Sequence, residues 1–248
     1  MLISNSDWRK YIRRLSAVNQ KAADAMQYWL DTHPGAGTDE LIYTAFVLSD
    51  TYGEAAAALA CEMYDATAEI QGVSVPPAIP AETASFQEVA KAVQGTMKNL
   101  QNTVPATVGR LVKQAGADTM LRNAERDGAQ FAWVPMGDTC AFCLTLASRG
   151  WQRQSKKAMK RGHAEHIHAN CDCTYAVRFD GRSGVQGYDP GRYLTMYENA
   201  EGDTPQEKIN AMRREFYAEN KDRINEQKRS AYAKRVERNS PAAEEADV

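Results

Sequence analysis

The sequence lacks any apolar run long enough to cross a bilayer. Its longest apolar segments, residues 45–48 and 55–61, fall far short of the ~20 residues that a membrane-spanning helix needs. The first residues also lack the apolar core of a signal peptide, because Asp7, Arg9 and Lys10 follow too early. We therefore expect no membrane partner and a chain made in, and at first located in, the cytoplasm of the cell that synthesises it.

A strong excess of charge of one sign is also missing. The net charge of −2 gives no bulk attraction to nucleic acid or to acidic membranes. No Gly-rich phosphate-binding loop and no Gly-x-Ser-x-Gly elbow is present, so two common enzyme motifs are absent. The 248 residues, of which 43% are hydrophobic, suffice for one large domain or two modest ones.

Cysteine is scarce and unevenly placed. Four of the five cysteines fall between Cys140 and Cys173, and Cys61 stands apart in an alanine-rich stretch. We interpret Cys61 as a small buried hydrophobe. In a reducing compartment, closely spaced cysteine pairs indicate metal ligands before disulfides.

Apolar residues at steps of three and four predict helices over the first hundred residues. One helix begins after the N-cap Ser6 and ends at residues 32–35, and a second runs from residues 38–40 to 71–72. The pair is expected to form an antiparallel hairpin. Three prolines in residues 73–82 predict an extended connector. Two further helices follow, one opened by the Ser85/Glu88 capping box and one by Thr103 and Pro105.

The pattern changes after residue 127. Alternation at Phe131, Trp133 and Pro135 predicts a short strand, and residues 173–179 predict a second. The two segments bracket the cysteine cluster, so pairing them would bring its ends together. A short helix after Asp189 and a long charged helix from Thr204 complete the prediction.

The predicted fold class is α+β and mainly α. It consists of a helical N-terminal half, a small zinc-stapled region with a short two-stranded sheet, and a long C-terminal helix. The predicted division is a helical hairpin (1–72), a Pro-rich connector (73–84), a helical and zinc-knuckle domain (85–203), an amphipathic helix (204–239) and a disordered acidic tail (240–248).

The cysteine cluster has the spacing of a zinc knuckle. Cys140 and Cys143 form a Cys-x-x-Cys pair, and after 24 intervening residues His168 and Cys171 form a His-x-x-Cys pair, followed by Cys173. Zinc takes four tetrahedral ligands, so one of these five candidates is spare. Cys171 and Cys173 would point to opposite sides of an extended chain. Our preferred set is Cys140, Cys143, His168 and Cys171, with Cys173 as the competitor, and an all-cysteine set remains open.

A structural role for the metal is predicted. His163 and Glu165 near a Cys-x-x-Cys are similar to the zinc deaminase signature, but the order of the two motifs is reversed. Catalytic zinc also keeps an open coordination position, and here the candidates can close the site. We therefore expect no enzyme. Four basic residues between the ligand pairs could contact phosphate or form a solvated face: Lys156, Lys157, Lys160 and Arg161.

Residues 140–150 together with His168, Cys171 and Cys173 resemble the phage minor capsid or head morphogenesis proteins of the Mu F-like family. The resemblance is most specific over residues 138–174. It implies a virion protein of the phage head at the portal vertex, with the portal and major capsid proteins as partners and packaged phage DNA as a possible contact. It implies no catalysis by this region.

Two other functions stay open at this point. One is a metal-dependent hydrolase or nuclease in which Glu165 acts with His163 or His166 as acid–base groups. The other is a non-catalytic DNA-binding module that uses residues 156–161 and the last helix, which carries ten Lys or Arg against six Asp or Glu.

Overall fold

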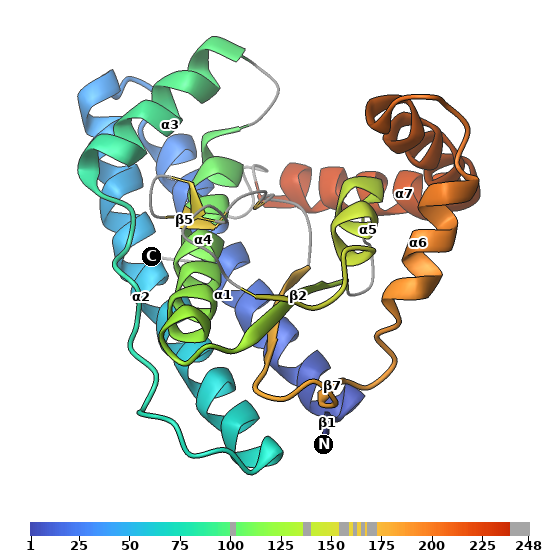
Figure 1. Cartoon of the computed structure of the whole chain (residues 1–248). Coiled ribbons are helices and arrows are strands. Elements are labelled where there is room, and N and C mark those ends of the chain that lie inside the picture. The colour runs from blue at the N-terminus through green and yellow to red at the C-terminus, as the bar shows by residue number, and fades with distance from the viewer. Residues whose placement is uncertain are drawn as a thin grey trace.

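The structure, a computed structural model, describes residues 1–99, 103–135, 140–153, 159–160, 163–164, 167 and 173–238. The fold is mainly helical with a small sheet, as the sequence predicts. Helices α1 to α4 gather on one side of the molecule, and α5 and α6 on the other, with β2 between them, while α7 begins beside α6 and runs back toward the first group (Figure 1). The predicted acidic tail at residues 240–248 lies outside the described residues.

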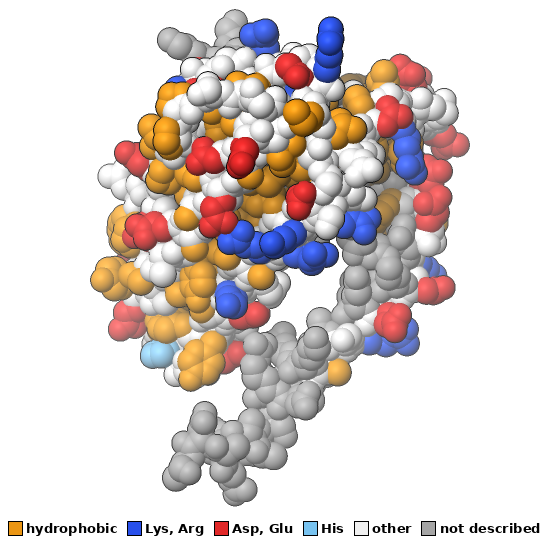
Figure 2. All heavy atoms as spheres, turned by 90° about the horizontal axis from the view of Figure 1, so that it is seen from below, with side chains coloured by type: hydrophobic (Ala, Val, Ile, Leu, Met, Phe, Trp, Pro, Cys, Tyr) orange, Lys and Arg blue, Asp and Glu red, His pale blue; other side chains and the backbone are white. Residues whose placement is uncertain are grey.

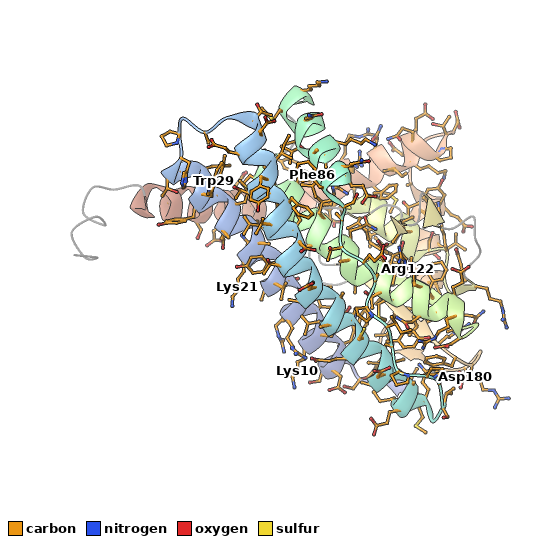
Figure 3. The ribbon with its side chains drawn as sticks, turned by 90° about the vertical axis from the view of Figure 1, so that its left-hand side faces the viewer. Lys10, Lys21, Trp29, Phe86, Arg122 and Asp180 are labelled. Carbon is orange, nitrogen blue, oxygen red and sulfur yellow. The ribbon has the colours of Figure 1, made fainter. Side chains whose placement is uncertain are left out.

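Helix α1 (Asn5–Thr32) begins one residue before the predicted N-cap. Ser4 takes that role, since its hydroxyl accepts a hydrogen bond from the Asp7 amide at 3.0 Å. The predicted apolar stripe is the buried face, with Trp8, Leu15 and Met26 almost fully enclosed. The outer side is basic, and Figure 3 labels Lys10 and Lys21 there.

Helix α2 (Thr38–Gln71) ends at Gly72, whose φ of 69° is a left-handed conformation that glycine adopts without strain. It carries seven Asp or Glu and no Lys, Arg or His. Arg14 of α1 pairs with Glu62 of α2 at 2.6 Å where the two helices meet. The α1–α2 unit is therefore basic along one helix and acidic along the other.

Helix α4 (Val104–Arg126) lies against both α1 and α2 and is buried along nearly its whole length. Glycine permits this close packing. A Cβ at Gly109 would lie 3.3 Å from the Asn19 carbonyl oxygen, and one at Gly116 would lie 3.3 Å from that of Ala56. The central helix therefore touches the backbone of both neighbours.

The Pro-rich connector runs extended from Val73 to Ser85, as predicted, and is held by side chains of α2 and α4. The Ala78 amide donates to Asp65 at 2.8 Å, and the Ala81 amide donates to Thr119 at 2.9 Å. Asn123 bonds both the amide and the carbonyl of Ile79, at 2.9 and 2.8 Å. These bonds give partners to backbone groups of Ala78, Ile79 and Ala81, in a segment that pairs with no strand among the described residues.

Helix α3 (Phe86–Asn99) starts at the predicted capping box. The Ser85 amide donates to the Glu88 carboxylate at 2.8 Å, and the Glu88 amide donates to the Ser85 hydroxyl at 3.4 Å. Val89 and Val93 are fully buried, which anchors the helix on the core.

The sheet forms where the two predicted strands pair. Strands β2 (Gln130–Val134) and β6 (Thr174–Arg178) are antiparallel, with Phe131 opposite Val177 and Val134 opposite Thr174. A third strand of two residues, β3 (Gln152–Arg153), pairs with the other edge of β2 and was not predicted. Strand β6 packs on α4 and α2, so the sheet is fixed to the helical body.

Two small strand pairs complete the β-structure of the described residues. Strand β1 (Leu2–Ile3) pairs in parallel with β7 (Gly184–Val185), and β4 (Met159–Lys160) pairs antiparallel with β5 (His163–Ala164). Neither pair was predicted, because two residues carry no periodicity.

The C-terminal helices pack against α5 (Ala141–Ala147). Helix α6 (Pro190–Asn199) is capped by Asp189, as predicted, and α7 (Pro205–Arg238) follows after a short loop. The side chains of Ile209 and Met212 are buried, which holds the first turns of α7 against the protein, and Lys208 donates hydrogen bonds to carbonyls at the end of α6. Seen from below, acidic and basic side chains are interspersed, and several Lys and Arg lie side by side (Figure 2). Among the described helices, none combines the length and apolarity that a bilayer crossing requires.

Candidate metal centre

The candidate metal centre lies at one end of the sheet. Because Val134 is opposite Thr174, the chain leaving β2 toward Cys140 and the chain entering β6 from Cys173 meet at the same end. Residues 33 positions apart in the sequence are thereby brought into one region. This is the juxtaposition that the sequence predicts from the two strand segments.

Cys140 and Cys143 sit on the first turn of α5. Cys140 is the N-cap residue, and its carbonyl accepts a hydrogen bond from the Leu144 amide at 3.1 Å. A spacing of three residues on a helical turn places the two side chains on one face. Cys143 is fully buried and Cys140 half-buried, so this face points into the protein.

Cys173 lies at the start of β6 and is also fully buried. Cys143 and Cys173 belong to one buried cluster with Leu146 and Ile167, and Cys140 packs against it. Three of the five predicted ligands therefore share one packed region.

Aromatic side chains surround this region. The Tyr175 ring contacts Phe131 at 5.5 Å and Trp133 at 4.6 Å between centroids, both edge to face. Burial raises the pKa of the Tyr193 phenol, and the nearby Cys173 thiol raises the same pKa, while Arg192 opposes both. Tyr193 belongs to α6, so this helix lies close to Cys173.

The segment between the two ligand pairs is held by polar residues of α4. Asp118, only 1% exposed, accepts a hydrogen bond from the Ala164 amide at 2.5 Å and one from the Gln114 side chain at 2.9 Å. The same Gln114 amide group donates to the Ala164 carbonyl at 2.8 Å. Ala164 is thus fixed by both its backbone groups, which tethers β5 to the central helix.

These two positions were missed in the sequence. The interpretation of α4 followed its apolar residues, and Gln114 and Asp118 were not singled out. The available signal was a Gln and an Asp four residues apart, a spacing at which two side chains meet on one side of a helix.

The remaining predicted ligands, His168 and Cys171, lie outside the described residues. Within the described part of the chain, no three His, Cys, Asp or Glu side chains form a group that could hold a metal ion. Cys140, Cys143 and Cys173 therefore do not by themselves form a metal-binding group, although they share one packed region, and the zinc site stays a prediction. The choice between Cys171 and Cys173 stays a prediction.

The basic stretch is described only in part. The backbone of Lys160 belongs to β4, and Lys156, Lys157 and Arg161 lie outside the described residues, as do Glu165 and His166. His163 is described as part of β5. The predictions of nucleic-acid contact and of acid–base chemistry stay predictions.

Comparison with known proteins gives one finding. A family model described as VG15 protein matches residues 2–200. The matched range covers the helical body, the sheet, the candidate metal centre and α6. No curated protein and no solved structure matches the chain significantly.

Proposed function

Because the chain belongs to the VG15 protein family, a family of phage and viral proteins, we propose that it is a minor structural component of a phage head. In this proposal it assembles at the portal vertex, with the portal and major capsid proteins as partners. The match to residues 2–200 supports a viral role, and the motif at residues 138–174 supports the narrower assignment to head morphogenesis proteins.

The proposal includes a structural zinc ion. The observation that carries it is the burial of Cys143 and Cys173 in one cluster, with Cys140 packed against that cluster. Thiolates are preferred zinc ligands, and a buried set of them suits a closed site. His168 or Cys171 would complete four ligands. Cys173 enters the set because it lies in the same cluster as Cys143.

The zinc would stabilise rather than catalyse. A catalytic zinc keeps one coordination position open to water or substrate, whereas Cys143 and Cys173 are fully buried. The ion would join α5 to β6 and would hold the connecting segment, which α4 already tethers through Ala164. Apparent binding energies for such sites are on the order of 10 kcal/mol, which is large for so small a region.

The test is to replace Cys140 and Cys143 together with serine. We expect about one zinc per chain in the wild type by metal analysis, none in the double variant, and a lower midpoint of thermal unfolding. Cys61→Ser is the matched control, because Cys61 is a half-buried cysteine of α2 outside the cluster. A metal-free wild-type protein whose midpoint is unchanged by chelator would refute the zinc proposal.

Two further single variants identify the ligand set. Cobalt replaces zinc in tetrahedral sites and gives thiolate charge-transfer absorption that grows with the number of sulfur ligands. We expect Cys173→Ser to lower this absorption, and Cys171→Ser to leave it unchanged if His168 is the fourth ligand. The virion assignment is tested separately, by mass spectrometry of purified phage particles. A chain absent from the particles would refute the structural role without affecting the zinc result.

A further inference from the structure

A groove runs along α2 beside the end of the connector. It has a volume of about 640 Å³ and lies on the side of the molecule that faces the viewer in Figure 3, where Phe86 is labelled. Phe46, Phe86 and Pro80 supply apolar lining, and the rings of Phe46 and Phe86 meet edge to face at 5.6 Å between centroids. Phe86 is 48% exposed, so the groove presents an aromatic surface to solvent.

The charge of this groove is of one sign. Asp50, Glu54 and Glu82 line it, and Glu54 and Glu82 are exposed. Neither α2 nor the connector contains a Lys, Arg or His. Thr83 donates its hydroxyl to Asp50, which leaves the carboxylate charge in place. An apolar lining with acidic groups suits a helix that carries basic and aromatic side chains on one face.

The chain contains such a helix. Ile209 and Met212 are buried and Phe216 is half-buried on one side of α7, and helical spacing puts Arg214, Tyr217 and Lys221 away from that side. All three are exposed, with Tyr217 at 46%. The helix as a whole has an excess of four basic residues, ten against six. Its outward face therefore has an aromatic side chain between two cations.

None of the described residues that line the groove belongs to α7. α7 begins beside α5 and α6, on the opposite side of the molecule from α3 (Figure 1). It is continuous for 34 residues, about 51 Å at 1.5 Å per residue, so its direction is fixed by its first turns. The partner that fits is the groove of another molecule.

We propose that the outward face of α7 of one copy docks into the acidic groove of a second copy. Tyr217 would pack against Phe46 and Phe86, while Arg214 and Lys221 would lie opposite Glu54 and Glu82. The two surfaces differ, so the contact is head to tail and can extend to further copies or close into a ring. Because the attraction is largely between exposed charges, it should weaken as salt is added.

A charge-swap experiment tests this with the full chain. One variant reverses the groove (Glu54→Lys with Glu82→Lys), and the other reverses the helix (Arg214→Glu with Lys221→Glu). Analytical ultracentrifugation at low salt should show wild-type assemblies heavier than the 27.5 kDa monomer, and each variant should associate at least about tenfold more weakly. An equimolar mixture of the two variants should associate again, because each groove then meets a helix of opposite charge.

Glu69→Lys is the matched control, since Glu69 is an exposed carboxylate of α2 that does not line this groove. It should leave association unchanged. Circular dichroism of each variant checks that the fold is kept. A wild-type chain that stays monomeric at low salt and high concentration, or a variant mixture that fails to associate, would overturn the proposal.

Discussion

Asp118 offers a sharp test of how the region between the ligand pairs is tethered. Its carboxylate accepts hydrogen bonds from the Ala164 amide and the Gln114 side chain, and it is 1% exposed. Asp118→Ala leaves both donors without this acceptor in a place that water barely reaches. A buried donor without a partner costs about 1–3 kcal/mol. Gln114 keeps its bond to the Ala164 carbonyl, so only the Ala164 amide is left without a partner, and we expect the free energy of unfolding to fall by about 1–3 kcal/mol.

The chain contains its own control for this change. On α1, Gln20 donates to Asp24 at 2.9 Å with the same spacing of four residues, but the pair is exposed. Such exposed pairs contribute about 0.2–0.5 kcal/mol, so Asp24→Ala should have a small effect. The two Gln–Asp pairs have the same spacing and bond length, so the contrast measures burial together with the bond that Asp118 accepts from the Ala164 amide.

Urea unfolding followed by circular dichroism measures both variants, with and without chelator. The loss in Asp118→Ala should persist in chelator, because the hydrogen bonds do not require the metal. Equal losses of unfolding free energy in Asp118→Ala and Asp24→Ala, or no loss in either, would refute the proposal that Asp118 fixes β5 to α4.

Two further predictions concern helix packing and acid stability. Gly116→Ala should destabilise the protein by about 1 kcal/mol in urea unfolding, because the new Cβ would lie 3.3 Å from the Ala56 carbonyl oxygen. Gly95→Ala is the matched control, because no atom lies within 4 Å of the new Cβ. It should stabilise the protein by about 0.5–1 kcal/mol in the same assay. The hydrogen bond from the Arg126 guanidinium lowers the pKa of the Asp127 carboxyl below its usual 3.8. The Asp127 carboxylate therefore adds to the free energy of unfolding at higher pH, and this stabilisation is lost as the pH falls through the lowered pKa. Asp127→Asn should therefore flatten the loss of thermal stability below about pH 4, and an unchanged acid profile would contradict this cause.

Most of the helical framework could be predicted because its signals are local. Periodic apolar residues, the Ser85/Glu88 capping box and the three prolines of the connector act within a few residues of their position. The strands at residues 130–134 and 174–178 alternate clearly enough to be recognised, and their pairing is confirmed. The two-residue strands β1, β3, β4, β5 and β7 depend on distant partners, which a single sequence does not identify.

The candidate site was predicted less completely. Its cysteine ligands could be proposed from the sequence, because Cys140 and Cys143 have the three-residue spacing of a metal-binding pair. The role of Asp118 could not be predicted the same way, because its acceptor function depends on Ala164, 46 residues later. Apolar periodicity describes which side of a helix is buried, and it does not tell which buried polar group has a backbone partner.

The connector between α2 and α3 has a consequence for how copies of this chain can combine. An extended, proline-containing hinge between helices is the kind of segment through which two molecules exchange a helix. Here Asp65, Thr119 and Asn123 hold its backbone to the helices of the same molecule. Exchange of α3 would break these bonds before any intermolecular contact forms. The hinge is thereby biased toward the closed monomer, and higher-order assembly is left to surfaces that do not require the fold to open.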